Sequence, residues 1–348
     1  MDKYSKIKLL GKGAFGEAWI VQNNINNTKY VMKLINTKKV KLDKIHQEIN
    51  ALQKISSNYC GSNSYCFEEW FLVYNGTETF YAIVTNYLEN AKELSKFMYN
   101  LDLPNILFIM QRLLEQLQKF HNVDLTHNDI KPENIIVQFN DDIIKNTLFI
   151  DFGLGCLDDN CKYSGTIMYM APEVLKNINK VTTLDNLKRG DIFSLGIVFY
   201  RLLNEKFPYP NILDFNHLFP ETIQSYNSDN SDLDSYSESE SSIQRNVQKQ
   251  NYIGNDIYPL FTFYKDHDIP LSNYLNSFLP ENTINDLNNL VNLMLTKDYT
   301  QRPDINQLFT IFLKINLSIV ENKYPSNNML SPNKKLQFSN INDDLYTE

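Results

Sequence analysis

The sequence predicts an α+β fold of two lobes: a small N-terminal lobe of five β-strands and one helix, and a larger, mainly α-helical C-terminal lobe. Two observations carry this prediction. Five short runs within the first 86 residues are rich in the β-branched and aromatic residues typical of strands. Beyond residue 90, apolar residues recur every three or four positions, which is the spacing of helices. The chain of 348 residues is long enough to bury a sizeable core.

The predicted N-terminal lobe covers residues 1–86. Its strands are expected at residues 7–10, 18–22, 30–35, 70–74 and 79–85. The last two flank a short loop with the Asn75-Gly76 hairpin signal. Between the third and fourth strands, residues 44–55 place apolar side chains on one face of a helix.

The predicted C-terminal lobe covers residues 87–320, which gives one domain of residues 1–320. Its clearest helices are expected at residues 104–122, 191–203, 283–295 and 304–315. Residues 225–244 hold eight serines and five acidic residues but no basic one. Such a stretch buries too little to offset its ordering entropy, so we expect a disordered insertion at 222–252. The polar tail at 321–348 is expected to be mobile.

The composition also excludes some classes of partner. A net charge of -8 repels nucleic acid and anionic membranes, so neither is an expected partner. No apolar run is long enough for a membrane span, and the first ten residues do not resemble a signal peptide. We therefore expect a soluble, intracellular and cytoplasmic protein, with the nucleus or a virion left open. A monomer is the default expectation.

The four cysteines, Cys60, Cys66, Cys156 and Cys161, are too few for a disulfide framework. Free thiols in a reducing compartment are expected. A zinc site built from both pairs would need two to four residues between its cysteines, and only the second pair has that spacing. Zinc binding is therefore not favoured.

A glycine-rich loop follows the first predicted strand and reads Gly11-Lys12-Gly13-Ala14-Phe15-Gly16. This pattern alone is a weak signal, because dinucleotide-binding folds use the same spacing between a strand and a helix. Here it lies between two predicted strands. Lys33 lies inside the third strand, where a lysine is either a solvated surface charge or the partner of an anion.

Three further motifs follow in a fixed order: His127-Asn128-Asp129-Ile130-Lys131-Pro132-Glu133-Asn134, Asp151-Phe152-Gly153 and Ala171-Pro172-Glu173. Together with the glycine loop and Lys33, they resemble the eukaryotic protein kinase family, serine/threonine type, over roughly residues 4–317. A lone Asp or Asn is more often a turn or cap residue, but the matched order favours the kinase interpretation.

The resemblance implies a role for each chemical group. Lys33 would contact the α- and β-phosphates of ATP, and Glu48 would pair with Lys33. Asp151 and Asn134 would bind Mg²⁺, with Mn²⁺ as an alternative ion, because hard cations prefer oxygen ligands. Asp129 would orient the substrate hydroxyl and accept its proton. Lys131 and Thr166 match the serine/threonine pattern rather than the tyrosine one.

The resemblance also implies which residues line the nucleotide site. They are Leu10, Gly11, Lys12, Gly13, Ala14, Phe15, Gly16, Ala18, Val31, Lys33, Thr85, Asn86, Leu88 and Ile136. Ala18 and Val31 exchange the valine and alanine that the family usually places above adenine, a volume-conserving swap that packed sites tolerate. Thr85 would be a small gatekeeper before a hinge at residues 86–88, leaving a pocket behind the adenine site.

Other family positions bear on stability and regulation. Glu173 is expected to form a buried ion pair with Arg302, and Asp191 to hold the backbone of the catalytic loop. Asn128 replaces the arginine that often receives a phosphate on the activation segment, residues 151–173. The usual phosphosite position falls on Lys162. We therefore predict activity without activation-segment phosphorylation.

The expected function is ATP-dependent phosphoryl transfer to serine or threonine hydroxyls of protein substrates. The alternative is a pseudokinase scaffold that binds nucleotide or partners without useful turnover. A small-molecule kinase on the same fold is a third possibility, disfavoured by the intact segment at residues 165–173. The expected kinase groups are all present, which favours the enzyme.

Overall fold

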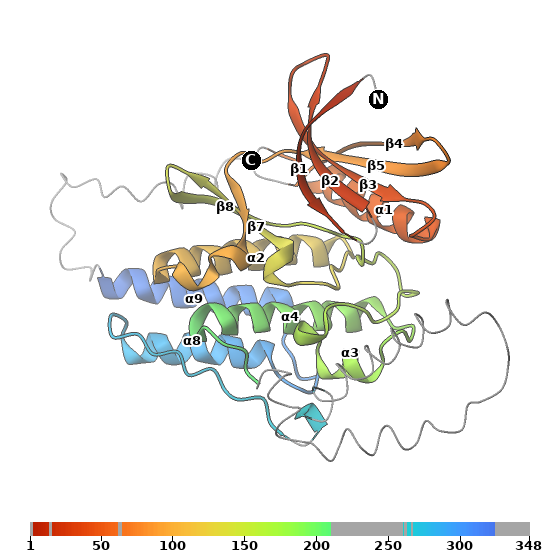
Figure 1. The fold of residues 1–348 in the computed structure, drawn as a ribbon. Coiled ribbons are helices and arrows are strands. Elements are labelled where there is room, and N and C mark those ends of the chain that lie inside the picture. Colours follow the sequence, from red (N-terminus) through yellow and green to blue (C-terminus); the bar gives the residue numbers. More distant parts are fainter. Residues whose placement is uncertain are drawn as a thin grey trace, which may run out of the picture.

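The computed structural model describes residues 3–13, 16–61, 65–209, 260, 263–265 and 267–323. It contains a strand-rich N-terminal lobe above a helical C-terminal lobe (Figure 1). The N-terminal elements are β1 (Tyr4–Lys12), β2 (Gly16–Asn23), β3 (Lys29–Asn36), α1 (Leu42–Tyr59), β4 (Phe67–Asn75) and β5 (Glu78–Asn86). The C-terminal elements are β6 (Ala91–Glu93), α2 (Leu103–Asn122), β7 (Ile135–Asn140), β8 (Ile143–Phe149), α3 (Pro172–Lys176), α4 (Leu184–Asn204), α8 (Glu281–Met294) and α9 (Ile305–Lys323). The predicted fold class is confirmed.

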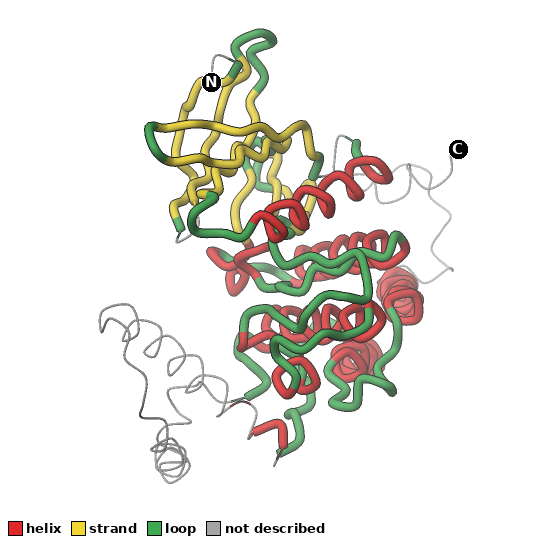
Figure 2. Tube along the Cα trace, turned by 90° about the vertical axis from the view of Figure 1, so that its right-hand side faces the viewer, coloured by secondary structure: helices red, strands yellow, loops and turns green. Residues whose placement is uncertain are grey.

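The N-terminal sheet has the strand order β1-β2-β3-β5-β4, and all neighbours are antiparallel. Alternate residues of each strand face opposite sides, so the sheet has two apolar faces. On β3, Leu34 belongs to an outer cluster and Ile35 to the main core. The main core includes Ile45 and Leu52 of α1, which lie on one side of that helix. Figure 2 shows α1 as the helix beside the strands.

The C-terminal lobe is built around α4. Its buried positions lie on all sides of the helix, as expected for a helix enclosed by its neighbours. Helices α2 and α8 pack against it, and α9 packs against both α2 and α8. A second sheet, β6-β7-β8, lies against α2 on the side of the N-terminal sheet (Figure 1). Within the part of the chain that the structure describes, no helix is long and apolar enough to cross a membrane.

Several boundaries differ from the sequence-based expectation. α4 begins at Leu184 rather than at residue 191, because the Thr183 hydroxyl caps it by accepting from the Asn186 backbone N–H at 3.4 Å. α9 continues to Lys323, past the expected domain end at residue 320. The strands β6, β7 and β8 and the short α3 were not predicted. The expected insertion at 222–252 and all tail positions after Lys323 lie outside the described residues.

Candidate functional site

Three charged groups from distant parts of the chain meet between the lobes. Lys33 Nζ of β3 lies 2.7 Å from Glu48 Oε1 of α1 and 2.8 Å from Asp151 Oδ1, just after β8. Burial disfavours the charge of Lys33, but Glu48 and Asp151 outweigh this effect and raise the pKa of the amine. Lys33 therefore remains a cation poised between two carboxylates.

The two carboxylates differ in their environment. Burial raises the pKa of Glu48, although Lys33 opposes the change. Burial also favours a higher pKa for Asp151, but the nearby Lys33 charge has the larger effect and lowers that pKa. Asp151 thus remains ionised with one side chain oxygen engaged by Lys33. The carboxylate has further lone pairs available to a cation.

Local sequence explains how these groups are positioned. Glu48 follows Ile45 by three positions and precedes Leu52 by four, so it shares their inward side of α1 and is 5% exposed. Asp151 has φ 63, a left-handed conformation that Asp tolerates better than most residues. The next residue, Phe152, is fully buried and its ring lies 4.8 Å from that of His127. This packing fixes the turn that presents Asp151.

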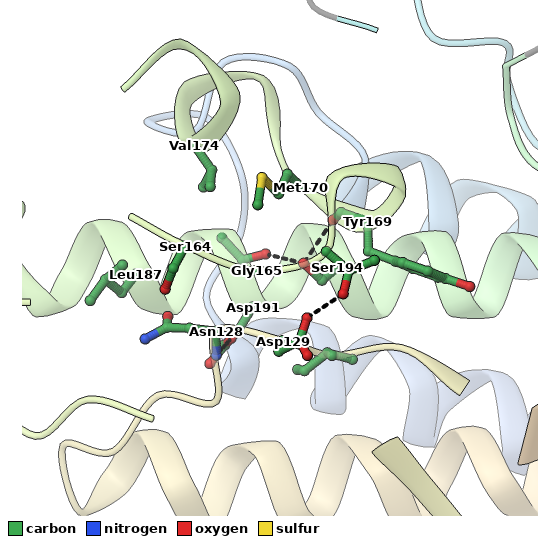
Figure 3. A pocket seen from close by; sticks show the side chains of 13 residues that line it. Asn128, Asp129, Ser164, Gly165, Tyr169, Met170, Val174, Leu187, Asp191 and Ser194 are labelled. Carbon is green, nitrogen blue, oxygen red and sulfur yellow. Dashed lines mark hydrogen bonds between the residues drawn. The ribbon is translucent and has the colours of Figure 1, made fainter. Parts of the chain in front are cut away.

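A second group of residues surrounds Asp129. Thr166 Oγ1 donates to Asp129 Oδ1 at 2.6 Å, and Lys131 Nζ lies 2.8 Å from Asp129 Oδ2. Lys131 Nζ also donates to Thr166 Oγ1 at 2.7 Å, which closes a triangle. In Figure 3, Asp129 and Asn128 lie opposite Ser164 and Gly165 of the activation segment, with α4 behind them. Catalytic loop and activation segment are thus joined through one carboxylate.

Asn134 lies beside Asp129 and its orientation decides which of its atoms is available. Its Nδ2 donates to the Asp129 carbonyl oxygen at 2.9 Å and to Asp129 Oδ2 at 3.0 Å. The amide oxygen then remains for a cation, which suits an oxygen-ligated ion such as Mg²⁺. Asn134 and Asp151 therefore form a chemically suitable donor set for the expected metal.

A buried aspartate of α4 binds the backbone of the catalytic loop, residues 127–134. Asp191 is 1% exposed, and its two oxygens accept from the backbone N–H groups of His127 at 2.8 Å and Asn128 at 2.7 Å. His127 Nε2 in turn contacts the Ile150 carbonyl oxygen at 3.0 Å. The expected tether between Asp191 and the loop backbone is present.

The ion pair expected from the sequence also forms. Arg302 Nη1 lies 2.8 Å from Glu173 Oε1, and the two side chains are 0% and 7% exposed. The guanidinium also donates to the carbonyl oxygens of Thr296 and Arg189. Full satisfaction of its hydrogen-bond donors makes this burial tolerable. The pair joins the end of the activation segment to the loop before α9.

The expected nucleotide-lining residues lie along β1, β2, β3, β5 and β7. Lys33 pairs in register with Ala18, and Val31 pairs with Thr85. A Cβ on Gly16 would collide with the Leu34 carbonyl oxygen, so this glycine allows the close approach of β2 to β3. Of the other expected residues, Leu10, Gly11 and Lys12 lie on β1, and Gly13 follows it. Asn86 ends β5 and Leu88 lies two positions further on, at the expected hinge, while Ile136 lies on β7. Ala14 and Phe15 lie outside the described residues.

Two contacts of the activation segment were not predicted. Asn128 Nδ2 donates to the Leu154 carbonyl oxygen at 2.9 Å, so the residue that replaces arginine holds the segment directly. Gln47 of α1 donates to the Gly155 carbonyl oxygen at 2.5 Å. Gln47 precedes Glu48, and nothing in the sequence distinguishes it from a surface glutamine. Asn128 has a left-handed φ of 62. Asparagine adopts this conformation more readily than most residues, so its presence at position 128 is the sequence signal that could have indicated this turn.

The expectation of four free thiols is wrong for this structure. Disulfides join Cys60 to Cys66 and Cys156 to Cys161, with Cα atoms 5.4 and 6.1 Å apart. Both Cα–Cα distances lie in the range that a disulfide requires. Asp158 lies close to Cys156 and Cys161, but the bonded sulfurs are not thiolate ligands for a metal. The first disulfide joins the residue after α1 to the residue before β4, and the second lies within residues 151–173.

The same motifs and geometry recur in known proteins. Residues 4–311 match the protein kinase domain family. Calcium-dependent protein kinase 6 of Plasmodium berghei is 32% identical over 212 residues, covering 58% of this chain and 13% of that protein. Serine/threonine-protein kinase cds1 of Schizosaccharomyces pombe is 30% identical over 223 residues, covering 59% of this chain and 45% of that protein. The matched part thus spans less than half of these relatives' length. Because its family match covers most of its length, this chain belongs to the protein kinase domain family.

Proposed function

We propose that this protein transfers the terminal phosphoryl group of ATP to serine or threonine hydroxyls of protein substrates. The observation that carries the proposal is the triangle of Asp129, Lys131 and Thr166, with separations of 2.6 to 2.8 Å. A carboxylate in this arrangement can accept a proton, and the Lys131 cation beside it can offset negative charge that develops during transfer. Phosphoryl transfer depends on such positioning and charge neutralisation.

Each residue then has a defined task. Lys33, held by Glu48 at 2.7 Å, binds the phosphates of ATP. Asn134 and Asp151 would hold Mg²⁺, which neutralises charge on the phosphate oxygens when bound. Asp129 orients the substrate hydroxyl and accepts its proton while the new oxygen–phosphorus bond forms and ADP leaves.

We also propose that the activation segment needs no phosphate. Asn128 donates a neutral hydrogen bond of 2.9 Å to the Leu154 carbonyl oxygen. It occupies the position where many relatives have an arginine that binds a phosphate on the activation segment. Thr166 is engaged by Asp129 and Lys131, and Tyr163 is 5% exposed. Adding a phosphate to either hydroxyl would break contacts that hold the site together. The segment is therefore ordered by its own contacts.

Radiolabelled ATP with a mixture of protein substrates tests the activity. Label should appear on serine or threonine, and Asp129→Asn should lower the rate by at least about 100-fold, the usual effect of losing a general base. Nucleotide binding without transfer would instead indicate a pseudokinase scaffold. Transfer to small molecules alone would contradict the protein substrate.

Phosphatase treatment tests the second proposal. The treated protein should retain its rate, and Ser164→Ala should behave as the wild type. Loss of activity on dephosphorylation, mapped by mass spectrometry to Tyr163, Ser164 or Thr166, would contradict independence from phosphorylation.

A further inference from the structure

The space behind the gatekeeper position holds an unexpected side chain. Thr85, the second-last residue of β5, is 2% exposed, and its Oγ1 donates to the Tyr65 hydroxyl at 3.3 Å. Tyr65 lies two positions before Phe67, which pairs with Thr85 across β4 and β5. Tyr65 therefore reaches Thr85 from the strand edge that faces away from β3. A small residue at position 85 does not by itself leave this region open.

The hydroxyl end of Tyr65 lies in the interior. Burial raises the pKa of Tyr65 to about 12, and the charges of Lys33, Glu48 and Asp151 all act on it. The ring packs against the main core, which includes the inward side of α1. The hydroxyl thus lies against the buried Thr85 side chain, which is the region that a ligand would enter on passing the gatekeeper.

The backbone that follows Tyr65 is held at several points. Cys66 is bonded to Cys60, the residue that ends α1. The Cys66 N–H donates to Asn86 Oδ1 at 2.8 Å, and the Asn86 N–H donates to the Cys66 carbonyl oxygen at 3.0 Å. The Phe67 N–H donates to Ser56 Oγ at 2.6 Å. Shifting the backbone at residues 66 and 67 would therefore disturb both α1 and Asn86.

We propose that Tyr65 closes the space behind Thr85 and restricts the nucleotide site to ligands that end at the gatekeeper. A purine nucleotide satisfies this limit. An ATP-competitive compound with an aryl group directed past Thr85 does not, because the ring and hydroxyl of Tyr65 occupy its place. Tyr65 is thus a specificity-determining residue for this site. The inference rests on the proposed function, because it takes residues 86–88 as the hinge that binds adenine.

Binding of two matched compounds tests the inference. Both carry the same hinge-binding heterocycle, and only one adds an aryl group directed past the gatekeeper. Isothermal titration should show that the wild type binds the short compound at least about tenfold more tightly than the extended one. Tyr65→Ala should bind the extended compound at least about tenfold more tightly than the wild type does, since the aryl group fills the vacated space.

Two controls keep the result interpretable. Tyr65→Phe retains the ring and should still reject the extended compound, which separates the bulk of the side chain from its hydroxyl. Tyr65→Leu also removes the ring but preserves apolar packing, so it should admit the extended compound if Tyr65→Ala fails to fold. Equal binding of both compounds to the wild type would overturn the inference. So would rejection of the extended compound by a Tyr65→Ala or Tyr65→Leu variant that binds the short one normally.

The assay measures binding and needs no turnover. A protein that shows the expected selectivity but transfers no phosphate would contradict the proposed function and leave the inference standing. A wild type that binds neither compound nor ATP would contradict both. A wild type that phosphorylates substrates yet accepts the extended compound would contradict the inference alone.

Discussion

Glu173→Ala should cost the protein far more stability than removal of a surface charge, because it leaves the Arg302 guanidinium buried without a carboxylate. The two side chains are 7% and 0% exposed and share two hydrogen bonds of 2.8 and 3.2 Å. Breaking such a pair costs about 3–5 kcal/mol. In the variant, Arg302 still donates hydrogen bonds to the carbonyl oxygens of Thr296 and Arg189. The free energy of unfolding should therefore fall by about 3 kcal/mol, the lower end of this range.

Glu173→Gln separates charge from hydrogen bonding. An amide oxygen still accepts from Arg302, so the loss should fall to about 1–2 kcal/mol, the difference between a charged and a neutral hydrogen bond. Urea denaturation followed by far-ultraviolet circular dichroism suits the measurement, because it reports the helical lobe. The two tryptophans, Trp19 and Trp70, lie in the other lobe.

Glu89→Ala is the matched control. Glu89 pairs with Lys29 at 2.9 Å, a similar distance, but the two side chains are 68% and 49% exposed. Its loss should cost less than about 0.5 kcal/mol. If Glu173→Ala cost no more than Glu89→Ala, the argument from burial would be refuted.

Three further outcomes are expected. Gly16→Ala should lower the free energy of unfolding by about 1–3 kcal/mol, because its Cβ would meet the backbone of β3, while Gly11→Ala, with open space, should have little effect. Asp151→Asn should cost less than about 1 kcal/mol at pH 7, since the side chain is 49% exposed. The pKa of Asp151 is lowered in the fold, so its contribution is present above the unfolded pKa and should vanish in unfolding curves recorded below the folded one. Asn128→Ala should lower kcat by about five- to tenfold, as one lost hydrogen bond predicts, with ATP affinity unchanged by calorimetry.

The fold was predictable where periodicity was strong. The five strands and α1 appear near their expected positions because alternating or helical apolar patterns specify them locally. The start of α4 was missed by seven residues, since the polar residues Asp185, Asn186, Lys188 and Arg189 interrupt the apolar pattern of its first turns. Strand β6 was missed because it has only 3 residues, and β7 and β8 because they are stabilised by contacts with each other and, for β8, with α2.

The site was predictable only as a set of residues. Lys33 and Asp151 are 118 positions apart, and only the ordered motifs of a known family place them together. Contacts outside those motifs could not be foreseen, including Gln47 to Gly155 and both disulfides. Each depends on how a loop folds over a neighbouring element, and loop conformation leaves little trace in the periodicity of a sequence.

The anchoring of the catalytic loop on α4 assigns the groups of the candidate site to two different lobes. Asp191 fixes the backbone at His127 and Asn128 from within the C-terminal lobe, whereas Lys33 and Glu48 belong to the N-terminal sheet and α1. Under the proposed function, a hinge motion that released ADP would therefore move Lys33 and Glu48 away from the nucleotide while Asp129 kept its place on the C-terminal lobe. The acceptor side of the reaction would stay assembled between one turnover and the next.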